Sequence, residues 1–126
     1  MHTWSTQTVH SARYTNPSGH GLFSFELHRR AALQLLRDSG AARAAALRKL
    51  PLIRGNVRGE LGARWMDEWD RLLHTGTDTE ILDTILGHGE WADDMRQVSP
   101  LVFALTGADR TQALSTVRSL REARAA

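Results

Sequence analysis

The chain has 126 residues, of which 41% are hydrophobic and 24% charged, and its formal net charge is +2, values typical of one globular domain. It contains no cysteine, which excludes disulfides and thiolate metal sites. No stretch approaches the roughly 20 apolar residues of a membrane span, and the polar N-terminus lacks the apolar region of a signal peptide, so we expect a cytoplasmic protein.

Residues 1–22 are expected to form a flexible N-terminal arm in front of a helical domain over residues 23–126. Residues 16–21 read NPSGHG, which is typical of turns, and no apolar periodicity precedes them. Terminal segments of this kind are often poorly ordered. The sequence leaves two interpretations open: the arm is loosely attached, or it is a partner-binding element.

The first two helices are predicted on either side of Gly40. Ser24 can cap the first helix, and Gly40 ends it. The apolar residues on one face of this helix are Leu27, Ala31 and Leu35. A second, alanine-rich helix covers about residues 41–50 and ends or bends at Pro51, because proline lacks the amide hydrogen of an inner helical turn. Residues 51–59 include two glycines and predict a loop.

The strongest helical pattern lies at about residues 60–74, where apolar residues recur with a period near 3.6. The residues of this stripe are Leu61, Trp65, Trp69, Leu72 and Leu73. Tryptophans that share a helical face with leucines are typical of a core, so both are expected to be buried. Thr77 and Glu80 then match a capping box, which predicts a helix that ends near Gly87.

Two further helices complete the predicted fold. A short one covers about residues 90–98, with Trp91 and Met95 one turn apart. The apolar run 101–105 predicts a buried turn or a short helix. Thr106 can cap the last helix. The inward-facing residues of that helix are expected to be Ala113, Leu114, Val117 and Leu120. No strand pattern and no repeat is present, so the predicted fold class is all-α, an irregular bundle of about five or six helices.

The sequence contains no recognisable catalytic or metal-binding constellation. The six histidines do not occur at HxH, HxxxH or HExxH spacing, which would bring two imidazoles to one side of a helix. Acidic pairs occur at Asp67/Asp70 and Asp93/Asp94. For the first pair, neighbouring arginines favour a solvated charged surface over general acid–base chemistry. We therefore expect a protein that is not an enzyme and that has no metal and no cofactor.

Charge is segregated along the chain. Residues 1–59 hold nine positive and two negative side chains, a net charge of +7, whereas residues 60–105 hold three positive and ten negative, a net charge of −7. This pattern predicts either two oppositely charged faces or internal neutralisation.

The acidic half supplies the candidates for binding a protein partner. Trp91 is included because tryptophan is enriched among interface hot spots. Arg96 either satisfies the open carbonyls of a helix end or reaches the partner. The partner-binding candidates are Asp67, Asp70, Trp91, Asp93, Asp94 and Arg96.

The basic half supports an alternative, a nucleic-acid-binding transcriptional regulator that uses the arginine-rich surface of residues 29–58. Arginine makes bidentate contacts with phosphates, although a GC-rich genome is the favoured explanation of the arginine excess, and the alanine excess supports it. The candidates for this surface are Arg29, Arg30, Arg37, Arg43, Arg48 and Lys49. A helix-turn-helix reader built on residues 90–98 is disfavoured, because its carboxylates would repel phosphates.

Two segments together resemble a known group of proteins. Residues 65–73 read WMDEWDRLL and residues 95–101 read MRQVSPL. They are similar to small actinobacterial helical proteins with an EWxxLL helix followed by an LRQxSPF turn, except that Leu101 replaces the phenylalanine. Members of that group are often encoded beside a nucleotidyltransferase-like protein, as an antitoxin sits beside its toxin. The resemblance implies a non-catalytic, antitoxin-like protein that neutralises or regulates a protein partner; a homo-oligomer is also compatible with it.

Overall fold

The computed structural model describes residues 3–125, which form seven α-helices and one short 3-10 helix and contain no strand. In chain order these elements are α1 (Thr6–Ser11), α2 (Leu22–Arg37), α3 (Ser39–Asn56), α4 (Gly59–Thr75), α5 (Asp78–Ile85), α6 (Glu90–Gln97), η1 (Leu101–Ala104) and α7 (Gly107–Ala125). The predicted all-α class, a small irregular bundle, is confirmed. Within the described residues, no helix is both long and apolar enough to cross a bilayer.

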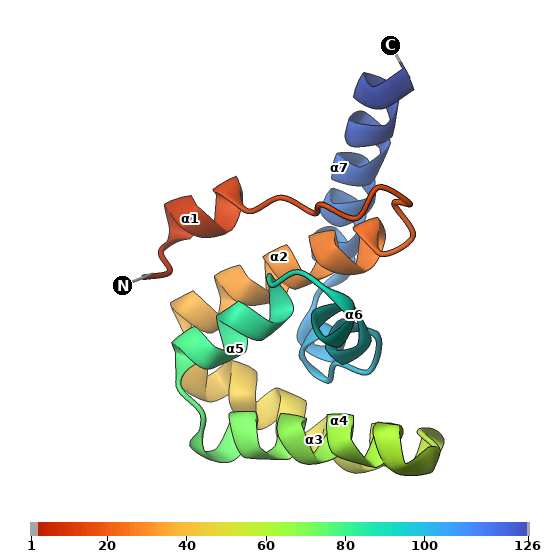
Figure 1. Ribbon diagram of the computed structural model, residues 1–126. Coiled ribbons are helices and arrows are strands. Elements are labelled where there is room, and N and C mark those ends of the chain that lie inside the picture. The colour runs from red at the N-terminus through yellow and green to blue at the C-terminus, as the bar shows by residue number, and fades with distance from the viewer. Residues whose placement is uncertain (1–2, 126) are drawn as a thin grey trace.

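The helix α2 is the centre of the bundle (Figure 1). It contacts α1, α3, α5, α6, η1 and α7. Phe25 and Leu35 of this helix are buried in one core with Ile81 and Leu82 of α5 and Met95 of α6. Because most elements cover the same helix, apolar burial along α2 joins them into a single unit.

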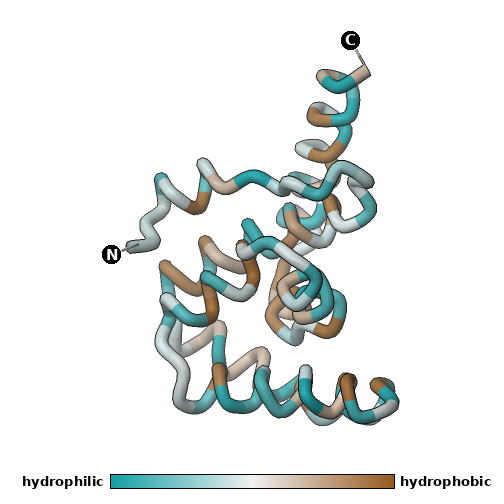
Figure 2. Tube along the Cα trace, in the orientation of Figure 1, coloured by the Kyte–Doolittle hydropathy of each residue, from teal (hydrophilic) through white to brown (hydrophobic). Residues whose placement is uncertain are grey.

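The helices α3 and α4 form a hairpin at one end of the bundle, and α7 projects from the opposite side with the C-terminus at its far end (Figure 1). The first turn of α4 extends beyond the helices that cover its middle. Leu61 lies in that turn and is exposed, so its predicted place in the core is wrong. Figure 2 shows apolar residues at the end of this hairpin where α3 turns into α4.

The junction between α2 and α3 differs from the prediction. Gly40 does not end a helix; it lies inside α3. The residue at the junction is Asp38, which closes α2 and accepts a hydrogen bond from the Ala41 amide at 3.1 Å. A side-chain acceptor at this position satisfies one of the free amides of the new helix. The start of α2 also differs from the prediction: Gly21 precedes its first turn, and Ser24 lies within that turn.

The helix α3 continues through Pro51 to Asn56, so the loop predicted for residues 51–59 is mostly helical. Proline deprives this helix of one backbone hydrogen bond. Ile53 and Val57, which follow the proline, pack against the core. Their burial offsets the lost hydrogen bond and extends the helix.

The N-terminal segment is packed against the bundle, contrary to the expectation of a flexible arm. Residues 1 and 2 lie outside the described residues. Ser5 and Thr8 form a capping box at the start of α1, and Val9 is fully buried in the core. Arg29 of α2 donates hydrogen bonds to three backbone carbonyls of the segment, those of Val9, His10 and Ala12. The segment is held through these backbone carbonyls and through single side chains such as Val9, and neither kind of contact gives an apolar periodicity in the sequence.

The predicted tryptophan core is confirmed for one of the two residues. Trp69 is 0% exposed, whereas Trp65 is only half-buried. Leu114 was expected to face inward and is 42% exposed. Only a narrow face of α7 is covered, that of Ala113 and Val117, and Leu114 lies beside it.

Candidate functional site

Arg96, a candidate for partner binding, is buried and turned toward the fold. Its side chain is 2% exposed. One amino group donates to the backbone carbonyls of Ile85 at 3.1 Å and Gly87 at 2.9 Å. The other donates to the carboxylate of Asp93 at 2.6 Å. Arg96 therefore satisfies carbonyls that the end of α5 leaves without helical partners, which is the structural alternative weighed for this residue.

The solvent face of α6 retains part of the predicted partner-binding set. Trp91 is 45% exposed, Glu90 is exposed and Asp94 is half-buried. Neither Glu90 nor Asp94 forms a side-chain hydrogen bond or ion pair within residues 3–125. Asp93 instead turns toward Arg96 and is engaged. We call Glu90, Trp91 and Asp94 the α6 surface.

Asp67 and Asp70 lie on the outer side of α4 but are each paired locally. Asp67 accepts from Arg54 of α3 at 3.0 Å, and Asp70 lies 3.1 Å from the Nδ1 of His74. All four side chains are well exposed, so these pairs are weak and open to competition by a partner. The structure does not bring Asp67 and Asp70 together with the α6 surface into one site.

A second group of acidic residues is neutralised across α4 and α5. Arg71 contacts Glu68 at 2.6 Å and Glu80 at 3.1 Å. These hydrogen bonds raise the pKa of Arg71. The pKa of Glu80 is lowered first by the hydrogen bond from the Thr77 amide, and then by Arg71. Arg71 is one of the three cations already counted in the net charge of −7 for residues 60–105, so these pairs occupy two of the ten carboxylates but leave that net charge unchanged.

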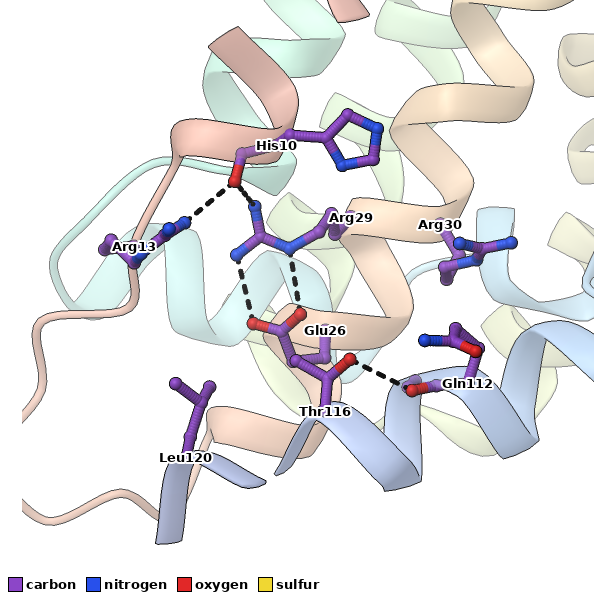
Figure 3. Close-up of a pocket in the computed structure, with 9 residues that line it drawn as sticks. His10, Arg13, Glu26, Arg29, Arg30, Gln112, Thr116 and Leu120 are labelled. Atoms are coloured by element: carbon purple, nitrogen blue, oxygen red, sulfur yellow. Dashed lines mark hydrogen bonds and ion pairs between the residues drawn. The ribbon is translucent and has the colours of Figure 1, made fainter. Parts of the chain in front are cut away.

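Three of the six cations proposed for nucleic acid serve the fold itself. Arg29 is the first, and Figure 3 shows it between the backbone of His10 and the carboxylate of Glu26. Its guanidinium contacts Glu26 at 2.8 Å, and the Glu26 side chain is 3% exposed. Arg29 therefore has little donor capacity left for a phosphate.

Arg30 and Arg43 are engaged in the same way. Arg30 donates to Asp109 of α7 through two nitrogens, at 3.1 and 3.0 Å. Arg43 contacts Asp78 of α5 at 2.7 Å and the Leu72 carbonyl at 3.0 Å. Burial acts to raise the pKa of Asp78, but hydrogen bonds from Ser39 and Arg43 outweigh it, and the pKa is lowered. The pKa of Asp109 is lowered against burial in the same manner, by hydrogen bonds from Thr106 and Arg30.

The other three cations of the alternative set face solvent. Arg37, Arg48 and Lys49 are exposed, and none of them has an ion pair within residues 3–125. The Lys49 ammonium lies 5.9 Å from the centroid of the Phe103 ring. The nucleic-acid surface is thus reduced to half of its predicted residues.

A hollow of about 280 Å³ lies between the N-terminal segment, α2 and α7. Figure 3 shows Arg13 and Arg30 on opposite sides of it, with Leu120 at one edge. The carboxylate in this hollow belongs to Glu26, and both of its oxygens accept from Arg29. An engaged carboxylate of this kind is a poor general base. Within the described residues, no three His, Asp or Glu side chains are placed to hold a metal ion.

His28 is a buried histidine that the sequence analysis did not single out. Its Nδ1 lies 2.7 Å from the Ser24 carbonyl, so Nδ1 carries the proton. Its Nε2 is buried and has no partner. Burial, and to a lesser extent the charge of Arg96, lowers the pKa of His28 to about 4, against the effect of the Ser24 bond. His28 is therefore neutral at physiological pH.

Two exposed apolar residues beside the basic surface were also missed. Phe103 is 47% exposed and Leu52 is 59% exposed. Leu52 fell in the loop predicted after Pro51, and residues 101–105 were predicted to form a buried turn or a short helix. If the helix had been extended past Pro51, the three-residue spacing between Lys49 and Leu52 would have placed these two residues on one face of α3.

No family model, no curated protein and no solved structure matches this chain. The candidate surfaces are therefore defined by their geometry and chemistry.

Proposed function

We propose that this chain is a non-catalytic binding protein, antitoxin-like, which neutralises or regulates a cytoplasmic protein partner through the α6 surface. The observation that carries the proposal is Trp91, 45% exposed beside two carboxylates, of Glu90 and Asp94, that have no ion pair among the described residues. The resemblance to antitoxin-like proteins supports it. The absence of cysteine is in keeping with a reducing compartment.

The α6 surface is presented by a rigid element. Met95 and Arg96 of α6 are buried, and the Trp69 indole of α4 donates to the Met95 carbonyl at 3.0 Å. A large aromatic side chain on a fixed backbone loses little conformational entropy when it binds, which favours a role as an interface anchor.

The negative charge beside Trp91 indicates the chemistry of the partner's binding surface. An exposed indole with the carboxylates of Glu90 and Asp94 beside it fits an apolar pocket with a basic rim. Such complementarity raises the rate and the specificity of association more than the affinity. The same carboxylates disfavour nucleic acid at this surface, since phosphates would be repelled.

The experiment is a pull-down from the native host with the tagged full chain, with and without nuclease. Recovery of one stoichiometric protein that survives nuclease treatment is the expected result. Trp91→Ala should weaken binding of the recovered protein by about 2 kcal/mol, roughly 30-fold, as for an interface hot spot. Leu114→Ala is the matched control, because Leu114 is a similarly exposed apolar residue on α7.

Three outcomes contradict the proposal. Recovery of nucleic acid that is lost after nuclease, with no protein, favours the regulator alternative through Arg37, Arg48 and Lys49. Equal loss of binding in Trp91→Ala and Leu114→Ala would place the interface elsewhere. Turnover of a defined substrate by the purified chain, abolished by one point mutation, would show that it is an enzyme.

A further inference from the structure

We propose that the seam between α3 and η1 is a docking groove for an amphipathic helix with acidic flanks, supplied by another protein. We call it the α3–η1 groove. It lies on a different face and has the opposite charge from the α6 surface, so it goes beyond the function proposed above.

One face of α3 runs along the groove, and the alanines of this face form its floor. Ala41, Ala45, Lys49 and Leu52 follow one another at intervals of four, four and three residues, so they share one face of the helix. A hollow of about 340 Å³ opens at the N-terminal end of this face. It is lined by Gln34, Arg37, Asp38, Ala41, Ala42 and Ala104. Alanine side chains allow the axis of a second helix to approach closely.

The far end of the groove carries exposed apolar side chains. Leu52 is 59% exposed, and Phe103 of η1 is 47% exposed beside Lys49. Both lie on well-anchored elements, because η1 packs on α3 and its first residue, Leu101, is buried. Two exposed large apolar residues next to an alanine floor are suited to the repeating apolar side of an amphipathic helix.

The charge of the groove selects an acidic occupant. The segment 39–56 contains four basic and no acidic residues. Two of the four, Arg48 and Lys49, face solvent without an ion pair among residues 3–125, as does Arg37 of α2. Two nearby carboxylates are already engaged, since that of Asp38 caps α3 and that of Asp109 is paired with Arg30. Carboxylates beside the apolar stripe of a docked helix would meet these three cations.

The apolar content favours a protein helix over nucleic acid. Leu52 and the alanine floor offer nothing to a phosphate backbone, and Phe103 is a single aromatic residue rather than a series on which successive bases could stack. A helix in a groove uses the apolar floor and the cationic rim together.

The test is mapping by ¹⁵N NMR on the full chain. The probe is a synthetic amphipathic helical peptide of about 16 residues, with leucines at helical spacing and glutamates on both sides of them. The expected result is saturable shift changes at Ala41, Ala45, Lys49 and Phe103. The double variant R48E/K49E should raise the dissociation constant at least tenfold. R118E/R121E, with the same charge change on exposed positions of α7, should leave it unchanged.

Each other outcome overturns the proposal. These outcomes are shifts confined to other faces, equal binding of a peptide with lysines in place of the glutamates, and no binding at all. Shifts of the same residues by a duplex DNA, with affinity falling steeply as salt rises, would identify a nucleic-acid surface instead. Concentration-dependent shifts without peptide would identify a second copy as the occupant. The mapping uses the native chain, so it stands even if R48E/K49E fails to fold.

Discussion

The indole of Trp69 and the backbone of Met95 join α4 to α6. Trp69 donates to the Met95 carbonyl at 3.0 Å, and both side chains are 0% exposed. A fully buried hydrogen bond of this kind has no water to replace it when it is broken. It therefore fixes the backbone of α6 in register with α4, only one turn from the exposed Trp91.

Replacing Trp69 should destabilise the protein, and the loss of stability should be larger for alanine than for phenylalanine. Trp69→Phe removes the indole donor and leaves the Met95 carbonyl buried without a partner, which should cost about 1–3 kcal/mol. Trp69→Ala also empties a core site and should cost about 3–5 kcal/mol. Urea unfolding followed by circular dichroism measures both. Trp91→Phe is the surface control and should change stability by less than about 0.5 kcal/mol; equal effects at the two positions would contradict this view of the core.

Arg96→Met should lower stability. The Ile85 and Gly87 carbonyls lose their donor, and an unsatisfied buried acceptor costs about 1–3 kcal/mol. We expect a total loss of about 3 kcal/mol in the free energy of unfolding. Partner binding by the fraction that remains folded should be retained. Unchanged thermal melting together with lost binding would restore Arg96 as a recognition residue.

Arg29→Met should release the N-terminal segment while the rest of the bundle stays folded. Arg29 is the donor to three backbone carbonyls of that segment. Hydrogen exchange followed by mass spectrometry should show lost protection in residues 3–12, with α3 and α4 unchanged. The control is Arg37→Met, an exposed arginine of the same helix. Retained protection of residues 3–12 in Arg29→Met would show that Val9 and α1 hold the segment without it.

Acid should destabilise the protein through His28. Its pKa is about 4 in the folded chain against 6.5 for the free side chain, so the unfolded state binds its proton first. Stability should be full above pH 6.5 and fall by about 3 kcal/mol between pH 6.5 and 4. His28→Gln should flatten this slope. The carboxylates with lowered pKa values act at the acidic end of this window and below it: the stability from Glu80 is lost from about pH 4.5 downward, and that from Asp78 and Asp109 from about pH 3.8 downward.

The control for the pH experiment is His74→Gln, because the His74 side chain is 58% exposed and lies on α4. Denaturant unfolding at several pH values between 4 and 7 should give this variant the slope of the native chain. A slope in His28→Gln that equals the native one would assign the acid sensitivity to other groups.

Local signals predicted the fold well where a helix depends on its own sequence. Thr77 and Glu80 form the capping box that the sequence predicted, with both hydrogen bonds present. Thr106 likewise accepts from the Asp109 amide at the start of α7. Such contacts join residues three apart, so they can be recognised without any knowledge of the tertiary structure.

Features that depend on distant residues could not be predicted. The helix beyond Pro51 is supported by tertiary burial, which overrides an unfavourable local residue. Arg29 and Arg96 look like surface residues in the sequence but satisfy backbone carbonyls of other elements. These side chains point inward because the carbonyls lie there, and the positions of the carbonyls are known only once the helices are packed together. The candidate partner-binding set is accordingly smaller in the structure than in the sequence.

The way in which Arg29 holds the N-terminal segment has a consequence for sequence variation. It recognises carbonyl oxygens, which every amino acid carries, rather than particular side chains. A saturation library should therefore accept most residue types at His10 and Ala12 and very few at Arg29. The segment can therefore stay attached while its own sequence changes, so divergent relatives could share this arrangement without sequence identity in the segment.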